Sequence, residues 1–317
     1  MTPTAFAALL NTWPIKGRLG VAVSGGSDSM ALARLAKTVL GEVVALHFNH
    51  GLRPEAAAEA AWVKGQLEGL GIPTCVGTWP GPHPRRNIQA LARQARYQFF
   101  AAQQAALGLQ AVLVAHTQDD VLETFLLRLG RGSSVRGLCG LAPTQMVYGA
   151  TVWRPLLTVP RAALQDYLTT LNQSWLTDPS NTNPAFWRPR LRALTPALRR
   201  AGINAVSVQA SISALREADV ALDVWVDQLW QQSAISQTTQ VGLPFAGLVA
   251  LPFEVQLRLV QRAYRTLCPT AVMLPRREKF RLALSELANK PKRRSLGEVY
   301  LRQHDGVLWL TTNPKKP

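Results

Sequence analysis

The sequence predicts an α/β fold, a doubly wound parallel sheet followed by a second, mainly helical domain. From Arg18 to Leu157, short apolar runs typical of strands alternate with longer runs typical of helices. Such alternation favours parallel strands covered by helices on both faces. The runs VVALHF and VLVA are continuously apolar, as expected for strands buried on both sides. We place the two domains at residues 1–203 and 204–317.

The expected elements of the first domain follow in order. Strands are expected at 20–23, 43–48, 73–78, 111–115 and 152–156. Helices are expected at 29–40, 54–70, 87–107, 119–129, 160–171 and 190–199. Each strand is thus followed by a helix, which is the pattern of successive βαβ units.

The second domain is expected to begin with one long amphipathic helix, 205–232. Its core-side positions at helical spacing are Val208, Ile212, Leu215, Leu222, Trp225 and Leu229. Two further helices are expected at 252–267 and 276–287. A terminal strand pair, 295–302 and 306–311, is expected around an Asp305–Gly306 turn.

The overall charge points to a polyanionic partner. The chain of 317 residues carries a formal net charge of +16, and nucleic acid is the commonest partner of so basic a protein. No apolar run is long enough to span a bilayer and no signal peptide is recognisable, so we expect a cytoplasmic protein without membrane attachment. The three cysteines, Cys75, Cys139 and Cys268, lack CxxC spacing, which argues against zinc-ribbon, iron–sulfur and redox sites.

The strongest local motif is SGGSDS, which lies between a predicted strand and a predicted helix. A helix N-terminus offers unpaired N–H groups and a positive dipole end, and glycines let the backbone approach an anion closely. The residues expected to hold phosphates are Ser24, Gly25, Gly26, Ser27 and Ser29. Simple N-capping by Ser27 or Asp28 is the alternative, but it accounts less well for the whole motif.

The carboxylate of Asp28 would repel a bare phosphate in this turn. A Mg²⁺ ion bridging Asp28 and the phosphates of ATP would explain its position. The motif lacks the lysine of GxxxxGK[ST] and differs from GxGxxG. It resembles the signature of the PP-loop (N-type) ATP pyrophosphatases, whose fold is that of the adenine nucleotide α hydrolases. That resemblance implies cleavage of ATP between its α and β phosphates and transfer of AMP to a carbonyl oxygen.

A second motif, HTQDDVLET, begins at His116 after the fourth predicted strand. On a helix, Asp119 and Glu123 lie one turn apart on one face, and Asp120 lies on an adjacent face. Helix capping could explain one of these carboxylates. However, ligand sites of parallel sheets lie at the carboxyl ends of the strands, and this motif follows the end of such a strand. We therefore expect Asp119, Asp120 and Glu123 to form an acidic patch.

Further motifs follow in a fixed order and narrow the resemblance. They are LHFNHGLR from Leu46, NIQALARQARY from Asn87, the blocks LGRG and RGLCGL, WRPLL from Trp153, and DPSN from Asp178, followed by Arg190-Leu191-Arg192. Together over residues 18–200 they resemble the tRNA(Ile)-lysidine synthases. Gln89 and Pro189 depart from the family pattern, which weakens the residue-level correspondence at those two positions.

This resemblance implies the reaction, its substrates and its residues. ATP would adenylate the wobble cytidine of tRNA(Ile) with a CAU anticodon, and free L-lysine would displace AMP to give lysidine. Asp28, Asp119, Asp120 and Glu123 would be catalytic, with Asp28 and Asp120 on Mg²⁺. Beyond the SGGSDS residues, His50, Arg93 and Arg131 would contact ATP; Arg93, Arg96, Arg128 and Arg131 could also contact tRNA phosphates.

The second domain contains a basic run that we expect to bind tRNA. Its residues are Lys290, Lys292, Arg293 and Arg294, preceded by Arg276, Arg277, Lys279 and Arg281. Phosphate neutralisation by such a run would make binding strongly salt-dependent. A solvated basic surface is the alternative.

Two other functions stay open on sequence grounds. Another PP-loop tRNA enzyme, such as a 2-thiolating one, would be expected to carry paired cysteines. A non-catalytic tRNA-binding protein would not need intact SGGSDS and DDVLET motifs. An amide-forming synthetase would need a glutaminase part or an N-terminal cysteine nucleophile, whereas the sequence starts Met1-Thr2.

Overall fold

The computed structural model describes residues 1–84, 86–177, 187–269, 274–289 and 293–312. Backbone contacts divide the chain into two compact units, Met1–Leu215 and Arg216–Pro317. This division falls within the long helix α9 (Ala205–Ser233), whereas the sequence places the domain boundary before that helix. Each unit is described by itself.

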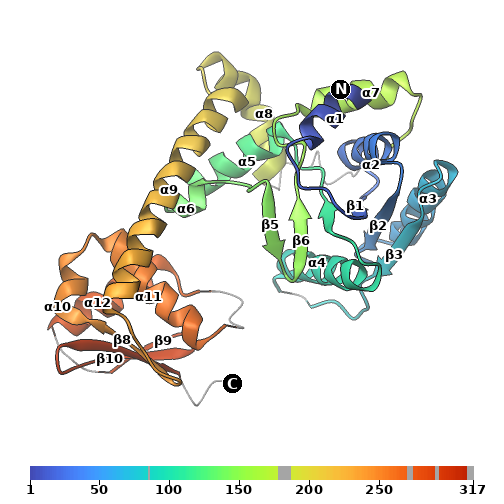
Figure 1. The fold of residues 1–317 in the computed structure, drawn as a ribbon. Coiled ribbons are helices and arrows are strands. Elements are labelled where there is room, and N and C mark those ends of the chain that lie inside the picture. Colours follow the sequence, from blue (N-terminus) through green and yellow to red (C-terminus); the bar gives the residue numbers. More distant parts are fainter. Residues whose placement is uncertain (85, 178–186, 270–273, 290–292, 313–317) are drawn as a thin grey trace. The chain divides into compact units, whose positions relative to one another are not determined.

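A six-stranded sheet forms the centre of the first unit, with strand order β3-β2-β1-β4-β6-β5 (Figure 1). The strands are β1 (Leu19–Ala22), β2 (Val43–Asn49), β3 (Thr74–Thr78), β4 (Ala111–Leu113), β5 (Thr144–Val147) and β6 (Ala150–Trp153). β1 pairs in parallel with both β2 and β4, so the strand order turns back at β1. The carboxyl ends of β1 and β4 are therefore neighbours, which is where ligands bind in such sheets.

The outer edge of this sheet differs from the expectation. The fifth strand lies at Ala150–Trp153 rather than at 152–156, and an unexpected strand, β5, pairs with it in antiparallel fashion. Tyr148 and Gly149 join them with φ of 46° and 86°, the positive values of a tight hairpin turn. β5 is mostly exposed, so it lacks the apolar run by which a buried strand is recognised.

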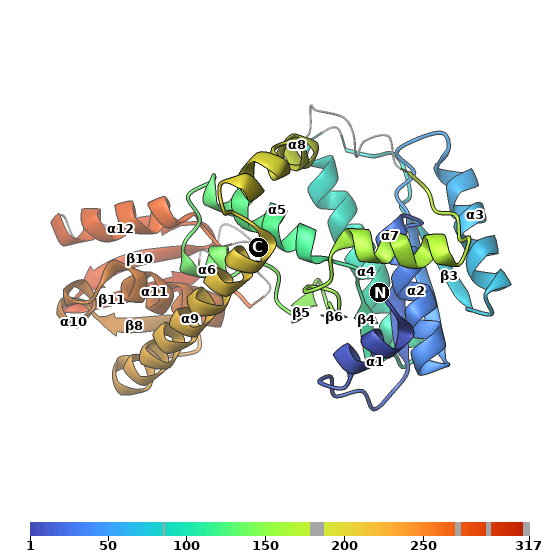
Figure 2. The same cartoon turned by 90° about the horizontal axis from the view of Figure 1, so that it is seen from above.

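Helices cover both faces of the sheet, as predicted. They include α1 (Pro3–Leu10), α2 (Ser27–Leu40), α3 (Ala56–Gly69), α4 (Ile88–Ala106) and α7 (Arg161–Thr170). Val43 and Ala45 of β2 join one core with α1, α2, α3 and α7, and Val44 and Leu46 join another with α4. α7 lies beside α2 in both views (Figures 1 and 2).

The first unit also contains α5 (Gln118–Leu129), α6 (Val135–Leu138) and α8 (Trp187–Arg200). Val121 and Leu122 of α5 pack with Val208 and Ile212 at the start of α9. The two α9 residues are among the predicted core-side positions of that helix. Of the other positions, Trp225 is 39% exposed, and the buried residue on that turn is its neighbour Val226.

The second unit contains more β-structure than the predicted strand pair. Its sheet has the order β7-β8-β11-β10-β9 and is antiparallel throughout. The strands are β7 (Ile235–Ser236), β8 (Gln240–Pro244), β9 (Arg294–Leu296), β10 (Val299–His304) and β11 (Val307–Thr312), with helices α10 (Phe245–Ala250), α11 (Phe253–Leu267) and α12 (Arg277–Asn289). Gly297, with φ of 64°, splits the run predicted as one strand into β9 and β10. Among the described residues, no helix is both long and apolar enough to cross a membrane.

Candidate active site

The SGGSDS motif forms the loop between β1 and α2. α2 begins after Gly26, whose extended backbone leaves the first amides of the helix without a side-chain cap. The Ser29 hydroxyl donates to the Gly26 carbonyl at 2.9 Å and accepts from the Ser24 amide at 3.1 Å. Ser29 thus holds the loop closed from within, while Ser24 is exposed and Ser27 is half-buried. The uncapped amides remain available to an anion, as the sequence predicts.

Gly25 is required by both backbone conformation and packing. Its φ is 93°, and a Cβ there would lie 2.7 Å from Val63 Cγ2 of α3 and 2.8 Å from Leu176 Cδ1. Its carbonyl accepts a 2.9 Å hydrogen bond from the Leu176 amide. The loop is therefore closed on one side by α3 and on the other by the segment that follows α7.

The second motif begins α5 with a capping box. Thr117 donates from its amide and its hydroxyl to Asp120 Oδ2, at 2.8 and 2.9 Å, and the Asp120 amide approaches Thr117 Oγ1. The capping interpretation thus holds for one carboxylate oxygen of Asp120. Its other oxygen, Oδ1, faces the SGGSDS loop.

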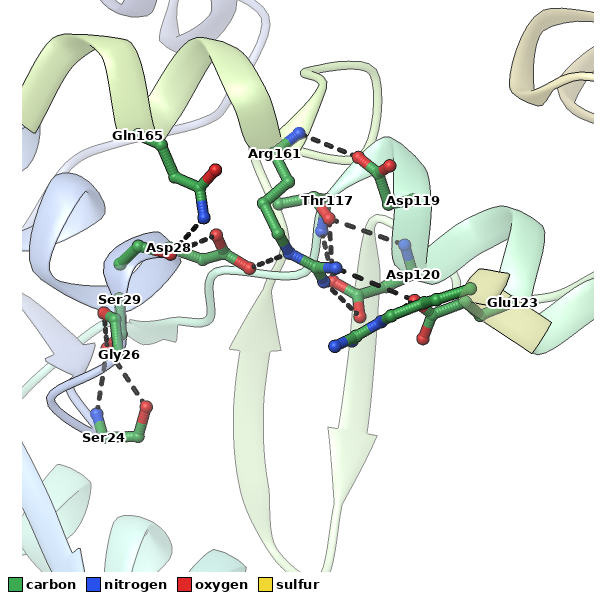
Figure 3. A network of polar contacts seen from close by, with 12 residues as sticks. Ser24, Gly26, Asp28, Ser29, Thr117, Asp119, Asp120, Glu123, Arg161 and Gln165 are labelled. Carbon is green, nitrogen blue, oxygen red and sulfur yellow. Dashed lines mark hydrogen bonds and ion pairs between the residues drawn. The ribbon is translucent and has the colours of Figure 1, made fainter. Parts of the chain in front are cut away.

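Arg161, the first residue of α7, joins the two motifs (Figure 3). Its Nε donates to Asp28 Oδ2 at 2.8 Å, and a terminal nitrogen lies 3.2 Å from Asp120 Oδ1. Its other terminal nitrogen lies 3.7 Å from Glu123 Oε1, and its amide donates to Asp119 Oδ2 at 2.8 Å. All four acidic residues predicted as catalytic therefore meet at one arginine.

Arg161 is not among the site residues that the sequence predicts. It lies outside both motifs, seven positions after Arg154 of the WRPLL block and directly after Pro160. A helix-opening arginine has no chemical signature of its own. The chain leaves β6, which lies beside β4, and α7 packs on α2, so the start of α7 lies beside both loops.

Burial and Arg161 act in opposite directions on the two central carboxyls. Burial raises the pKa of Asp28 above its usual value, although Arg161 lowers it, and Asp120 raises it further. Burial also acts to raise the pKa of Asp120, but Arg161 and the Thr117 amide outweigh it and the pKa lies below its usual value. Burial acts to lower the pKa of Arg161, but Asp28 and Asp120 raise it above its already high value. Asp120 and Arg161 are thus held ionised, and Asp28 is the easier of the two carboxyls to protonate.

Glu123 extends the acidic cluster toward α8. It is 5% exposed, and its Oε1 accepts from Arg192 Nε at 2.6 Å. Arg192 belongs to the Arg190-Leu191-Arg192 block, so that block contributes a guanidinium to the cluster. Among the described residues, Arg161 and Arg192 are thus paired with carboxylates of this cluster.

His116, which precedes the capping box, is fixed by Arg154. Arg154 is 1% exposed and donates from Nε to His116 Nδ1 at 3.0 Å. Its terminal nitrogens donate to the Ala142 carbonyl and to Gln145 Oε1. Burial lowers the pKa of His116 far below its usual value, opposed by Asp120 and reinforced by Arg154. A neutral His116 that accepts at Nδ1 carries its proton on Nε2, so it can donate one hydrogen bond.

The histidines of LHFNHGLR lie at the end of β2. His47 donates from Nδ1 to the Val23 carbonyl at 2.9 Å, which ties β2 to the end of β1. Burial, with Arg96 next, lowers the pKa of His50 to about 4, so its ring is neutral near pH 7. Its Nδ1 is buried without a hydrogen-bond partner among the described residues. His50 is therefore suited to a hydrogen bond with a ligand at this edge.

The arginines that the sequence predicts to contact ATP or tRNA phosphates lie in different environments. Arg93 and Arg96 of α4 lie over the Tyr97 ring, at 4.7 and 5.1 Å from its centroid. Arg128 donates to the carbonyls of Gly137 and Gly140, at 2.7 and 3.1 Å. Arg128 therefore holds the RGLCGL loop, whereas Arg131 is exposed.

Comparison with known proteins identifies the family of this chain. The profile of the PP-loop domain matches residues 3–198. A tRNA(Ile)-lysidine synthase of Rhodopseudomonas palustris is 40% identical over 271 residues, covering 83% of this chain and 78% of the relative. One of Methylobacterium nodulans is 35% identical over 326 residues, covering 98% of this chain and 96% of the relative. The chain belongs to the tRNA(Ile)-lysidine synthase family. The resemblance stated from the motifs is thereby confirmed.

Solved structures support the PP-loop fold. The U34-tRNA thiolase NcsA from Methanococcus maripaludis, which was solved with its [4Fe-4S] cluster, superimposes with a TM-score of 0.57. It is 15% identical and covers 68% of this chain and 79% of its own. At that identity the likeness extends to the fold alone.

The carboxylates of this site are suited to bind Mg²⁺ together with phosphates. Asp28 and Asp120 supply hard carboxylate oxygens on either side of one guanidinium, beside the uncapped amides of α2. Mg²⁺ usually takes only one or two protein carboxylates together with substrate phosphates and water. The described residues contain no cluster of three metal-binding side chains, and this mode of binding needs none.

Two predicted regions lie wholly or partly outside the described residues. DPSN, from Asp178 to Asn181, lies outside the described residues, as do Lys290 and Lys292 of the basic run. Arg293 is exposed and lies over the Tyr300 ring. Arg294 pairs with Glu286 of α12 at 2.8 Å.

Proposed function

We propose that this protein ligates free L-lysine to C2 of the wobble cytidine of tRNA(Ile) with a CAU anticodon, at the expense of ATP. Membership of the tRNA(Ile)-lysidine synthase family supports the reaction class. The observation that carries the proposal is the joining of the SGGSDS loop and the DDVLET acids by Arg161. The proposed phosphate site and the proposed site for a cationic amine would then lie side by side, as a two-step ligation requires.

The proposed reaction has two steps. The C2 carbonyl oxygen of cytidine attacks the α-phosphorus of ATP, and pyrophosphate leaves. The neutral ε-amine of lysine then attacks C2, and the C2–O bond breaks with release of AMP. The amine loses its protons along the way, and a carboxylate of the acidic cluster is suited to accept one.

The SGGSDS loop is proposed to bind the phosphates of ATP. The uncapped amides of α2, with the Ser24 and Ser27 hydroxyls, would donate hydrogen bonds to them. Asp28 and Asp120 would hold Mg²⁺, which would supply positive charge to the departing pyrophosphate. His50, Arg93 and Arg131 are proposed to complete the ATP site.

The acidic cluster is proposed to bind the lysine. Asp119 and Glu123 would attract the ammonium form from solution, since four acidic side chains gather at this place. Binding there would place the amine next to the loop that holds ATP. His116 Nε2–H is the available neutral donor beside Asp120.

The second unit is proposed to bind tRNA through its basic run. Replacing Lys292, Arg293 and Arg294 together with Ser should weaken tRNA binding and reduce its dependence on salt concentration. Glu286 is the partner of Arg294, so Glu286→Ser is a control that removes the ion pair without removing positive charge. An unchanged salt dependence in the triple variant would contradict this assignment.

Lysine incorporation tests the proposed reaction directly. Radiolabelled lysine should enter unmodified tRNA(Ile) carrying CAU only when ATP and Mg²⁺ are present, and should not enter methionine tRNA. Incorporation of labelled arginine in the same assay should be absent. A folded protein that releases pyrophosphate with this tRNA but incorporates no lysine would refute the lysine assignment.

A further inference from the structure

The sheet of the second unit has two faces of opposite character. Val299 and Leu301 of β10, and Leu308 and Leu310 of β11, point to one face and are buried. They belong to the core that also contains Val260 of α11. Figure 1 shows α10, α11 and α12 on one side of this sheet, in agreement with their contacts to its strands. The alternate residues form the opposite face of the sheet, away from these three helices.

This outer face carries aromatic and basic side chains in register. Arg302 is directly opposite Trp309, and Tyr300 is directly opposite Thr311. Its other members are His304, Val307, Ile235, Gln240, Gly242, Pro244 and Ser295, and Arg293 lies over the Tyr300 ring on the same face. Both aromatic rings are only partly buried, and Arg302 is exposed. We call these residues the outer sheet face.

Gly242 provides the space in which the Trp309 indole lies. A Cβ on Gly242 would be 2.9 Å from Trp309 Cζ3 and 3.1 Å from Cε3. The six-membered ring of the indole therefore lies close to the Gly242 backbone on β8. Val307 Cγ1 would also lie 2.9 Å from that Cβ, so both side chains use the space that Gly242 leaves.

Charge on the outer sheet face is positive. The Arg293 guanidinium lies 3.5 Å from the centroid of the Tyr300 ring, and Arg302 lies directly opposite Trp309 on the neighbouring strand. Among its described residues the face has no carboxylate; Glu298 and Asp305 occur only in the two turns at its ends. An acidic partner surface or a polyphosphate backbone would complement this charge.

We propose that the outer sheet face binds unpaired bases of an RNA strand, with Trp309 and Tyr300 stacking on bases and Arg293 and Arg302 contacting phosphates. Exposed sheets that combine aromatic rings with basic side chains bind single-stranded nucleic acid in this way. The inference deepens the proposed function, because it names the surface through which the tRNA substrate would be held. A second copy of this chain is the other occupant that such a face could accept.

Strands with and without bases distinguish stacking from charge attraction. The full-length protein is titrated into a fluorescent oligouridylate and into a ribose-phosphate strand of the same length without bases, with fluorescence anisotropy as readout. Wild type should bind the base-bearing strand more tightly. Trp309→Leu should lower that affinity about tenfold and leave the abasic strand unaffected, because leucine covers Gly242 but cannot stack.

Trp225→Leu is the matched control, since Trp225 is an exposed tryptophan on α9 of the same unit. It should leave both affinities unchanged, and Tyr300→Leu should reproduce the Trp309 effect. Equal loss in Trp225→Leu, or no base preference in wild type, would overturn the proposal. So would a wild-type dimer in sedimentation analysis that Trp309→Leu dissociates.

Failure of the proposed reaction and failure of the proposed RNA-binding face give different results in these experiments. If lysine is not incorporated but the base preference depends on Trp309, the outer sheet face still binds RNA and only the reaction is withdrawn. If lysine is incorporated and Trp309→Leu changes no affinity, the stacking proposal alone falls.

Discussion

Arg161 Nε donates to Asp28 Oδ2 at 2.8 Å across 133 residues of sequence. The same guanidinium lies 3.2 Å from Asp120. It therefore lies between the two carboxylates and supplies positive charge to both. In the proposed reaction we assign Arg161 the role of positioning these carboxylates.

Replacement of Arg161 by Gln should shift the pH dependence of activity. Because Arg161 lowers the pKa of both Asp28 and Asp120, its loss should raise both values. The acid limb of the kcat/KM profile for pyrophosphate release should then move to higher pH by about one unit. Arg161→Lys keeps the charge and should leave the limb near its wild-type position. A uniform loss of activity with an unmoved limb would show that Arg161 acts only on folding.

Replacement of Asp28 by Asn should separate adenylation from tRNA binding. The change removes charge beside the uncapped amides of α2 but leaves a side chain of the same size, so ATP–pyrophosphate exchange should fall at least about 100-fold. The tRNA dissociation constant should change less than about twofold, since the loss is confined to the phosphate site. Asp166→Asn, an exposed acid on α7, is the matched control. A parallel loss of tRNA affinity would contradict the proposed role of Asp28.

Replacement of Asp119 by Asn should affect lysine more than ATP. Asn can still accept the hydrogen bond that the Arg161 amide donates to residue 119, so the start of α7 should stay in place. Loss of one carboxylate from the proposed ammonium site should raise the KM for lysine about tenfold or more. The KM for ATP should change little, and Glu68→Gln on α3 serves as the exposed control. An increase confined to the KM for ATP would place residue 119 in the nucleotide site instead.

Acidification should destabilise the fold through its buried histidines. The pKa of His116 is lowered in the folded state, so between the unfolded value of 6.5 and the lower folded value the unfolded chain binds more protons. The contribution of neutral His116 to the free energy of unfolding is complete above pH 6.5. It decreases as the pH falls and is about 2 kcal/mol smaller at pH 5. Urea midpoints of His116→Gln should therefore decline less between pH 7 and pH 5 than those of wild type. His304→Gln, in the exposed hairpin, is the control; an equally steep decline in His116→Gln would disprove this account.

Most of the first unit could be predicted because its strands are apolar on both faces. Runs such as 43–48 stand out from their helical neighbours, and the order of the elements then implies a parallel sheet. β5 could not be predicted because it is exposed and because its Tyr148–Gly149 turn lacks the Asn-Gly or Asp-Gly signal of a hairpin. β7 and β8 could not be predicted because they are short. They also adjoin a glutamine-rich stretch in which apolar and polar residues do not alternate.

The sequence predicts those residues of the site that belong to recognisable motifs. SGGSDS and HTQDDVLET contain all the carboxylates of the cluster, and strand order alone brings them together. Arg161 and Arg192 could not be assigned from spacing, because their partners are distant in sequence. Arg128 resembles a phosphate-binding arginine in the sequence, yet backbone carbonyls of Gly137 and Gly140 use its donors.

The close packing around Gly25 links three distant positions. Since Val63 and Leu176 fill the space that a Cβ would need, no single substitution at residue 25 can be accommodated without a change in its neighbours. Relatives that differ at position 63 or 176 should therefore differ in a compensating way, with volume gained at one matched by volume lost at the other. These three positions should be inherited as a group, and a chimaera that takes α3 from one relative and the segment after α7 from another should lose the phosphate loop even though every motif residue is retained.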